Sequence, residues 1–287
     1  MYDVKQYKDE NFTIYELIDS STDARVKAAP ERGGIIIGFE VEGKELLYLN
    51  KETFYNAEAN VRGGIPILFP ISGQLENGEY EWDGKTYKMK NHGVARNNSW
   101  EVIDTNSNGE AAITMRLTST EETKNSFPFD FEVIFTYALK NNTLTIHQEY
   151  RNHSDSDMPI YAGFHPYFKT AQKELAYQTD AKRYLDYNDM KTKEINGTID
   201  LTDKKEALAL LDAEKKEIVF ELPEIEKKIQ MSYGSEFAYV VLWTEKENDF
   251  VCVEPWMAKT KELNNKEELL FISPGEALKT HLEITVV

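Results

Sequence analysis

Short runs of β-branched and aromatic residues, separated by turn residues, limit the fold of this chain more than any other feature. Residues 12–17, 131–137 and 143–150 are examples, and each alternates in polarity or stays apolar along its length. Such runs are typical of strands that bury one face or both. Helical periodicity is scarce, and its two weak candidates, 207–211 and 261–269, are interpreted as turns or loops. The pattern therefore predicts an all-β fold.

Turn sequences join these runs into hairpins. Asp83-Gly84 lies at the tip of residues 80–87, and this pair tolerates the positive φ that a tight hairpin turn requires. Asn106–Gly109 and Lys140–Asn142 are placed in the same way between alternating segments. Strands that recur about every 8–12 residues favour a sandwich or barrel over alternating strands and helices.

A single domain, residues 1–287, is expected. Length alone would allow two domains, but all-β domains often exceed the average domain size. The sequence shows no repeat of fixed period and no stretch with linker composition. Residues 169–203, the most irregular and polar stretch, are expected to form loops over one end of the sheets.

Charge and cysteine content narrow the class of protein. The chain has 33 basic and 50 acidic residues, a net charge of −17, which argues against a nucleic-acid partner. No apolar run approaches the roughly 20 residues of a membrane span, and residues 1–6 do not resemble a signal peptide. The single cysteine, Cys252, cannot form an intramolecular disulfide. We therefore expect a cytoplasmic protein without a nucleic-acid or membrane partner.

Four segments interrupt the strand pattern with glycine or proline, and each carries a side chain suited to acid–base chemistry or to anion binding. A lone histidine is usually part of the core, a lone glutamate is usually solvated, and a glycine pair usually marks a bend. Together, two histidines, a glutamate and an arginine at broken strand ends, with aromatic rings nearby, form a candidate acid–base site. The segments are 60–70 with Arg62, 91–97 with His92, 162–168 with His165, and 252–256 with Glu254.

Other kinds of site find little support in the sequence. The two histidines are separated by 72 residues, and the only cysteine lies within a predicted strand, so no zinc-binding pattern is present. A nucleophile elbow and a dinucleotide fingerprint are also absent. The expectation is a site without metal or cofactor. Aromatic rings in the broken segments could stack on the apolar face of a sugar.

The ordered motifs resemble those of the aldose 1-epimerase (galactose mutarotase-like) family. The matching segments begin with Gly63-Gly64-Ile65-Pro66 and Phe69-Pro70, followed by His92-Gly93-Val94-Ala95-Arg96 with Trp100, then His165-Pro166-Tyr167-Phe168 and Glu254-Pro255-Trp256. The resemblance extends from about residue 13 to residue 285. It implies a supersandwich of large antiparallel sheets with a sugar cleft on the concave face.

The resemblance also implies roles for particular residues. Glu254 corresponds to the general base of the family, His165 to its general acid and His92 to its second histidine. Arg62 corresponds to an arginine that orients the sugar. Trp256 and Phe168 are expected to contact the substrate, with Arg96, and an aspartate from the variable stretch is expected to complete the site. The candidates for that aspartate are Asp200, Asp203 and Asp212.

The expected activity is the interconversion of α and β anomers of an aldohexose or related sugar. Arg96 and the Gly-Gly-Ile-Pro segment are similar to the branch that includes hexose-6-phosphate mutarotases, whereas Ile71-Ser72-Gly73 departs from it. A neutral aldose is therefore favoured over a sugar phosphate. A non-catalytic carbohydrate-binding sandwich and a polysaccharide lyase or hydrolase are the alternatives. Hydrolysis normally requires two carboxylates, and only Glu254 stands out.

Overall fold

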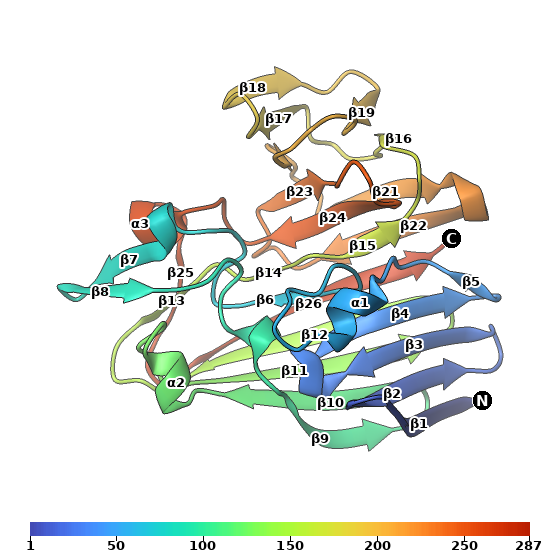
Figure 1. Ribbon diagram of the computed structural model, residues 1–287, viewed down its shortest axis with the longest axis horizontal. Helices are drawn as coiled ribbons and strands as arrows, with labels where there is room; N and C mark the ends of the chain where they lie inside the picture. Colours follow the sequence, from blue (N-terminus) through green and yellow to red (C-terminus); the bar gives the residue numbers. More distant parts are fainter.

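The computed structural model describes residues 1–287 and consists mainly of antiparallel sheets (Figure 1). The first sheet contains the N-terminal strands in sequence order. It comprises β1 (Tyr2–Asp9), β2 (Phe12–Asp19), β3 (Ala24–Ala29), β4 (Ile35–Val41) and β5 (Lys44–Glu45).

The second sheet brings together strands from the middle and the end of the chain. Its order is β21 (Glu217–Leu222), β22 (Lys227–Tyr233), β26 (Ala277–Val286), β12 (Thr143–Asn152), β11 (Phe131–Lys140), β10 (Ala111–Thr118) and β9 (Glu101–Asn106).

The third sheet carries most of the interrupted segments. Its order is β18 (Lys191–Glu194), β17 (Arg183–Asp186), β20 (Leu208–Leu210), β23 (Tyr239–Trp243), β24 (Phe250–Trp256), β14 (Gly163–Phe164) and β6 (Ile67–Leu68), and β15 (Tyr167–Lys169) also pairs with β24.

Three strand pairs and three short α-helices join these sheets, together with four 3₁₀ turns. The pairs are β7 (Glu79–Trp82) with β8 (Lys85–Lys88), β13 (Met158–Ile160) with β25 (Leu270–Ile272), and β16 (Glu174–Ala176) with β19 (Thr198–Asp200). The helices are α1 (Lys51–Tyr55), α2 (Glu121–Lys124) and α3 (Glu262–Asn265). No helix is long and apolar enough to cross a membrane.

Alternation along β11 shows why the sheets pack face to face. Phe131, Val133, Phe135 and Tyr137 are buried, and the residues between them are partly exposed. Phe135 packs against Phe164 of the third sheet with ring centroids 5.8 Å apart. Burying each such ring contributes about 1.5–3 kcal/mol. One cluster of 64 buried residues joins the sheets, so the third sheet rests on a rigid support.

The structure confirms the all-β prediction and the predicted hairpins. Asp83 and Gly84 have φ of 47° and 73° between β7 and β8, as a turn of this kind requires. The expectation of loops over residues 169–203 is wrong in part, because this stretch contains β16, β17, β18 and β19. In Figure 1 these short strands lie at one end of the molecule, beyond β23 and β24. Their mostly polar, partly exposed residues hide the alternation on which the prediction relied.

Candidate active site

His165 and Glu254 face each other because of the strand register around them. Gly163 pairs with Trp256, and Tyr167 pairs with Cys252. Counting inward from both pairs places His165 opposite Glu254, on the same face of the sheet. His165 lies in the gap between β14 and β15, where Pro166 offers no backbone donor to the ladder.

The two side chains meet in a buried position. His165 Nε2 lies 3.5 Å from Glu254 Oε1, and the side chains are only 9% and 2% exposed. Trp256 Nε1 donates a hydrogen bond of 3.1 Å to the other carboxylate oxygen, Oε2. Since Trp256 is two residues from Glu254 on β24, both side chains lie on one face of the strand. This hydrogen bond fixes the orientation of the carboxyl group.

Aromatic rings hold the imidazole of His165 in place. Tyr167 stacks on it with centroids 4.6 Å apart and an interplanar angle of 10°. Trp243 packs edge-on at 5.6 Å. The Nδ1 atom of His165 is buried without a hydrogen-bond partner. The imidazole is therefore positioned by packing, and its Nε2 is directed toward Glu254.

His92 lies beside this pair. Its ring centroid is 5.4 Å from that of His165 and 6.3 Å from that of Trp256. Nδ1 donates to the carbonyl oxygen of Ser72 at 2.5 Å, because a carbonyl can only accept. Burial is the main cause that lowers the pKa of His92 to about 3. His92 is therefore neutral at pH 7, and its Nε2 can accept a hydrogen bond.

Burial acts in opposite directions on the two members of the His165–Glu254 pair. Removal from water disfavours a charge on either group. It raises the pKa of Glu254 well above the ordinary value, and the hydrogen bond from Trp256 opposes this shift. It also lowers the pKa of His165, with a further contribution from nearby positive charges. Burial therefore favours a neutral pair that holds one titratable proton.

Two arginines lie near the histidines in different environments. Arg62 is 42% exposed at its side chain, pairs with Glu245 at 3.1 Å and lies over the ring of Trp243 at 5.5 Å. Arg96 is more enclosed: Nη2 donates to the carbonyl of Asn91 at 3.0 Å, and its buried Nε has no partner. Burial is the main cause that lowers the pKa of Arg96 to about 10, so it stays charged at pH 7.

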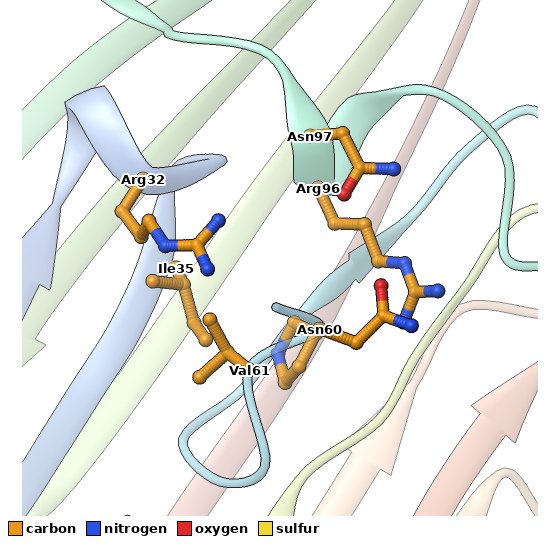
Figure 2. Close-up of a pocket in the computed structure, with 7 residues that line it drawn as sticks. Arg32, Ile35, Asn60, Val61, Arg96 and Asn97 are labelled. Atoms are coloured by element: carbon orange, nitrogen blue, oxygen red, sulfur yellow. The ribbon is translucent and has the colours of Figure 1, made fainter. Parts of the chain in front are cut away.

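A small pocket of about 10 Å³, large enough for roughly one water, lies on one side of Arg96. In Figure 2 the side chain of Asn60 points toward that of Arg96, and Arg32 lies across the pocket. Arg32 is occupied with backbone carbonyls, including that of Ala59 at 2.7 Å. Arg32 thereby holds the loop that leads into Arg62, and Arg96 keeps an unpaired donor.

The glycine pair after Arg62 allows two backbone segments to cross closely. Gly63 and Gly64 have φ of 133° and 67°. A Cβ on Gly64 would lie 2.2 Å from the carbonyl oxygen of Ile36, and one on Gly63 would lie 2.4 Å from that of Tyr48. The glycines therefore serve a close crossing within the protein's own backbone.

Some expected residues lie outside this group. Phe168 is fully buried in the core and packs against Phe220 at 4.9 Å, because it faces the opposite side of β15 from Tyr167. Tyr167 occupies the position that was expected for Phe168. The three candidate aspartates have partners outside the site: Asp200 accepts from the backbone of Thr202 at 2.7 Å, Asp203 pairs with Lys246 at 2.5 Å, and Asp212 pairs with Arg183 at 2.9 Å.

Cys252 belongs to the site and was not among the predicted site residues. It is fully buried, and its Sγ and the donor atoms of His165 and Glu254 all lie within 4.8 Å of one another. Strand alternation was the available signal, because Cys252 and Glu254 are two residues apart and must share a face. Trp243, from the neighbouring strand β23, was recognisable only as part of an apolar run.

Comparison with known proteins identifies the family. The family model for aldose 1-epimerase matches residues 17–285. This chain belongs to the aldose 1-epimerase family. Among solved structures, the Slr1438 protein from Synechocystis sp. PCC 6803 is 34% identical to this chain. The match covers 100% of this chain and 99% of the Slr1438 chain, with a TM-score of 0.93.

More distant members share the fold. Galactose 1-epimerase from Lactobacillus acidophilus NCFM is 16% identical to this chain. The match covers 100% of this chain and 98% of that protein's chain, with a TM-score of 0.77. A protein of Cenchrus ciliaris named "Putative glucose-6-phosphate 1-epimerase" is 25% identical over 240 residues, which are 78% of this chain and 64% of that protein. The galactose mutarotase-like supersandwich expected from the motifs is thus confirmed.

Proposed function

We propose that this protein is an aldose 1-epimerase that interconverts the α and β anomers of an aldohexose. The observation that carries the proposal is the buried His165–Glu254 pair, with Nε2 and Oε1 3.5 Å apart. A general acid and a general base close together are what anomer exchange needs. Membership of the aldose 1-epimerase family supports the same conclusion.

The reaction needs two proton transfers and no redox step. Glu254, as the carboxylate, removes the proton from the hydroxyl on C1, while His165, as the imidazolium, protonates the ring oxygen. The bond between C1 and the ring oxygen breaks, and the electron pair from the C1 hydroxyl forms the carbonyl of the open-chain aldehyde. Rotation about C1–C2 presents the other carbonyl face. Ring closure then returns both protons.

The proton held by the buried pair is sufficient for this cycle. In the neutral form, Glu254 is a carboxylic acid and His165 is a neutral imidazole. Transfer of that proton from Oε1 to Nε2 creates the base and the acid together, without exchange with solvent. Hydroxyl groups of a bound sugar would stabilise the two charges in place of water. Net charge in the site stays constant throughout.

Neighbouring side chains supply contacts for the sugar. His92 Nε2 can accept a hydrogen bond from a hydroxyl group, and the partly exposed Arg62 can donate one. The indole of Trp256 borders the pair and can pack against the sugar ring. None of these contacts requires a phosphate group, so a neutral aldose is the leading candidate.

The proposal is tested by following freshly dissolved α-glucose and α-galactose with polarimetry or with NMR of the anomeric protons. We expect the wild-type chain to accelerate equilibration above the buffer rate for at least one sugar. Sugar binding without acceleration would instead support a carbohydrate-binding sandwich. Equilibration of a broad panel of anomers at the buffer rate would refute the enzyme proposal.

A sugar 6-phosphate is a second candidate, favoured by the unpaired Nε of Arg96. A buried guanidinium with a free donor can bind phosphate through charge-assisted hydrogen bonds. The test compares kcat/KM for glucose and glucose 6-phosphate in wild type and Arg96→Ala. Arg116→Ala is the matched control, because Arg116 of β10 is paired at 2.6 Å with Glu101 of β9, the edge strand of the second sheet. A phosphate preference lost only in Arg96→Ala would establish this candidate, and equal effects of both variants would exclude it.

A further inference from the structure

Three side chains with different donor atoms converge in the candidate site. The ligand atoms of His165, Cys252 and Glu254 all lie within 4.8 Å of one another, and all three residues are buried. The register explains this: Cys252 and Glu254 alternate onto one face of β24, and His165 stands opposite Glu254. A nitrogen, a sulfur and an oxygen donor thus surround one point.

The three groups have donors available. One ring nitrogen of His165, Nδ1, has no partner, and the other, Nε2, faces Glu254 Oε1 at 3.5 Å without a closer contact to it. Trp256 occupies only the second carboxylate oxygen. Cys252 is a free thiol. These partly unsatisfied buried groups would gain from a shared ligand.

We propose that His165, Cys252 and Glu254 form a three-ligand site for a thiophilic divalent cation, Zn²⁺ or Cd²⁺, and that the bound ion inhibits the enzyme. Imidazole, thiolate and carboxylate are the three ligand types that bind zinc in proteins. Donor atoms around a tetrahedral zinc ion are roughly 3.3–3.8 Å apart, given metal–ligand distances of about 2.0–2.3 Å. Side-chain shifts of about 1 Å therefore suffice to close the site.

The same three residues balance the charge of the cation and make the cation compete with the substrate. On binding, the thiol of Cys252 and the carboxyl group of Glu254 release their protons to solvent, so thiolate and carboxylate together balance the two charges of the cation, and one position of the coordination shell stays open to water. A cation bound there removes Glu254 and His165 from acid–base work. Binding of the cation does not depend on the proposed function, whereas inhibition does.

A second place on the protein could bind the same ions, so the experiment must remove it. His147 and His281 stand directly opposite each other on β12 and β26, and both are exposed. A cross-strand histidine pair brings two imidazoles within reach of one ion. The His147–His281 pair contains no cysteine, however, so only the buried site with Cys252 produces a cadmium–thiolate absorption band.

The experiment titrates Cd²⁺ into the full chain carrying His281→Gln, with ultraviolet absorption and calorimetry as readouts. We expect about one equivalent to bind and to produce the thiolate band. Cys252→Ala in the same background should lose the band and weaken binding at least tenfold. Glu254→Gln should keep the thiol but weaken binding, which provides a second test if Cys252→Ala does not fold. Mg²⁺, which prefers oxygen donors, should not compete.

The activity arm uses Zn²⁺ with the same His281→Gln chain and a sugar that it epimerises. We expect inhibition to saturate at about one equivalent, to be relieved by excess sugar and to be reversed by EDTA. A thiolate band in a chain that epimerises no sugar would support the metal site and refute the proposed function. Binding without the band, or equal binding by Cys252→Ala, would overturn the metal site.

Discussion

Replacing Glu254 by glutamine separates the chemistry of the site from its shape. Glutamine has nearly the same volume, and its amide oxygen can still accept the hydrogen bond that Trp256 Nε1 donates at 3.1 Å. What is lost is a group that can take up the proton of the C1 hydroxyl. A positioned general base is worth about 10²–10⁴ in rate, or roughly 2.7–5.4 kcal/mol of activation free energy. Turnover should fall by that factor.

Stability should change little in Glu254→Gln. Burial raises the pKa of Glu254, so the folded wild type already holds a neutral carboxyl group that an amide imitates. The free energy of unfolding should therefore stay within about 1 kcal/mol of wild type. The dissociation constant for the sugar should also change little, because the amide oxygen can still accept a hydrogen bond from the C1 hydroxyl, and His92 and Arg62 are untouched.

The assay is anomer exchange measured by NMR, with urea unfolding and sugar binding measured on the same preparations. Glu268→Gln is the matched control, because Glu268 is a partly buried carboxylate bonded to Tyr239 at 2.7 Å and to Lys259. It should keep near-normal turnover. If Glu254→Gln is folded and binds sugar but keeps turnover within about threefold of wild type, Glu254 is not the base.

Four further outcomes are expected. His165→Asn should lower turnover about 10²–10⁴-fold with sugar binding retained, and retained turnover in the same NMR assay would remove His165 as the acid. The profile of kcat/KM against pH should show no inflection near 6.5. The His165–Glu254 pair gains a second proton only below the lowered pKa of His165, and it loses its one proton only above the raised pKa of Glu254. Activity should be unchanged after dialysis against EDTA, and a loss restored by one metal would contradict this. Gly64→Ala should lower the free energy of unfolding, measured in urea, by about 2–4 kcal/mol. The added Cβ would collide with the Ile36 carbonyl, and residue 64 has a φ of 67°. A loss under about 1 kcal/mol would show that the two crossing backbone segments can move apart.

Most of the fold could be predicted from the sequence, because the signals for strands and turns lie in short local segments. Alternation along residues 131–137 reports directly which side of a strand is buried, and Asp83-Gly84 reports a turn. The interrupted segments were equally visible, since glycine and proline are incompatible with a regular ladder. His92, His165 and Glu254 could therefore be singled out, and the structure brings all three together.

Orientation within the apolar segments could not be predicted. Tyr167 and Phe168 are both aromatic, and a one-residue choice of register decides which one stacks on His165 and which enters the core. The face that Cys252 shares with Glu254 follows from their spacing of two residues, but β24 is buried on both faces, so no polar alternation marks that face as part of a site. Asp203 and Asp212 pair with residues distant in sequence, Lys246 and Arg183, which local patterns do not reveal.

Two prolines explain how a regular sheet can hold an acid and a base face to face. Pro166 follows His165, and Pro255 follows Glu254, so each catalytic candidate precedes a residue without a backbone donor. Counting from the Tyr167–Cys252 pair, Pro166 stands opposite Val253, and the ladder keeps only a long contact of 3.4 Å from Val253 N to Pro166 O. The His165 amide bonds outside β24, to the carbonyl of Pro66 at 3.2 Å. The ladder between these strands is therefore interrupted over the three opposed positions from Phe164–Pro255 to Pro166–Val253, with the two side chains at its middle, while Gly163–Trp256 and Tyr167–Cys252 on either side fix their separation. A backbone that is irregular over three opposed positions and paired on both sides of them can place two buried ionisable groups accurately within the sheet.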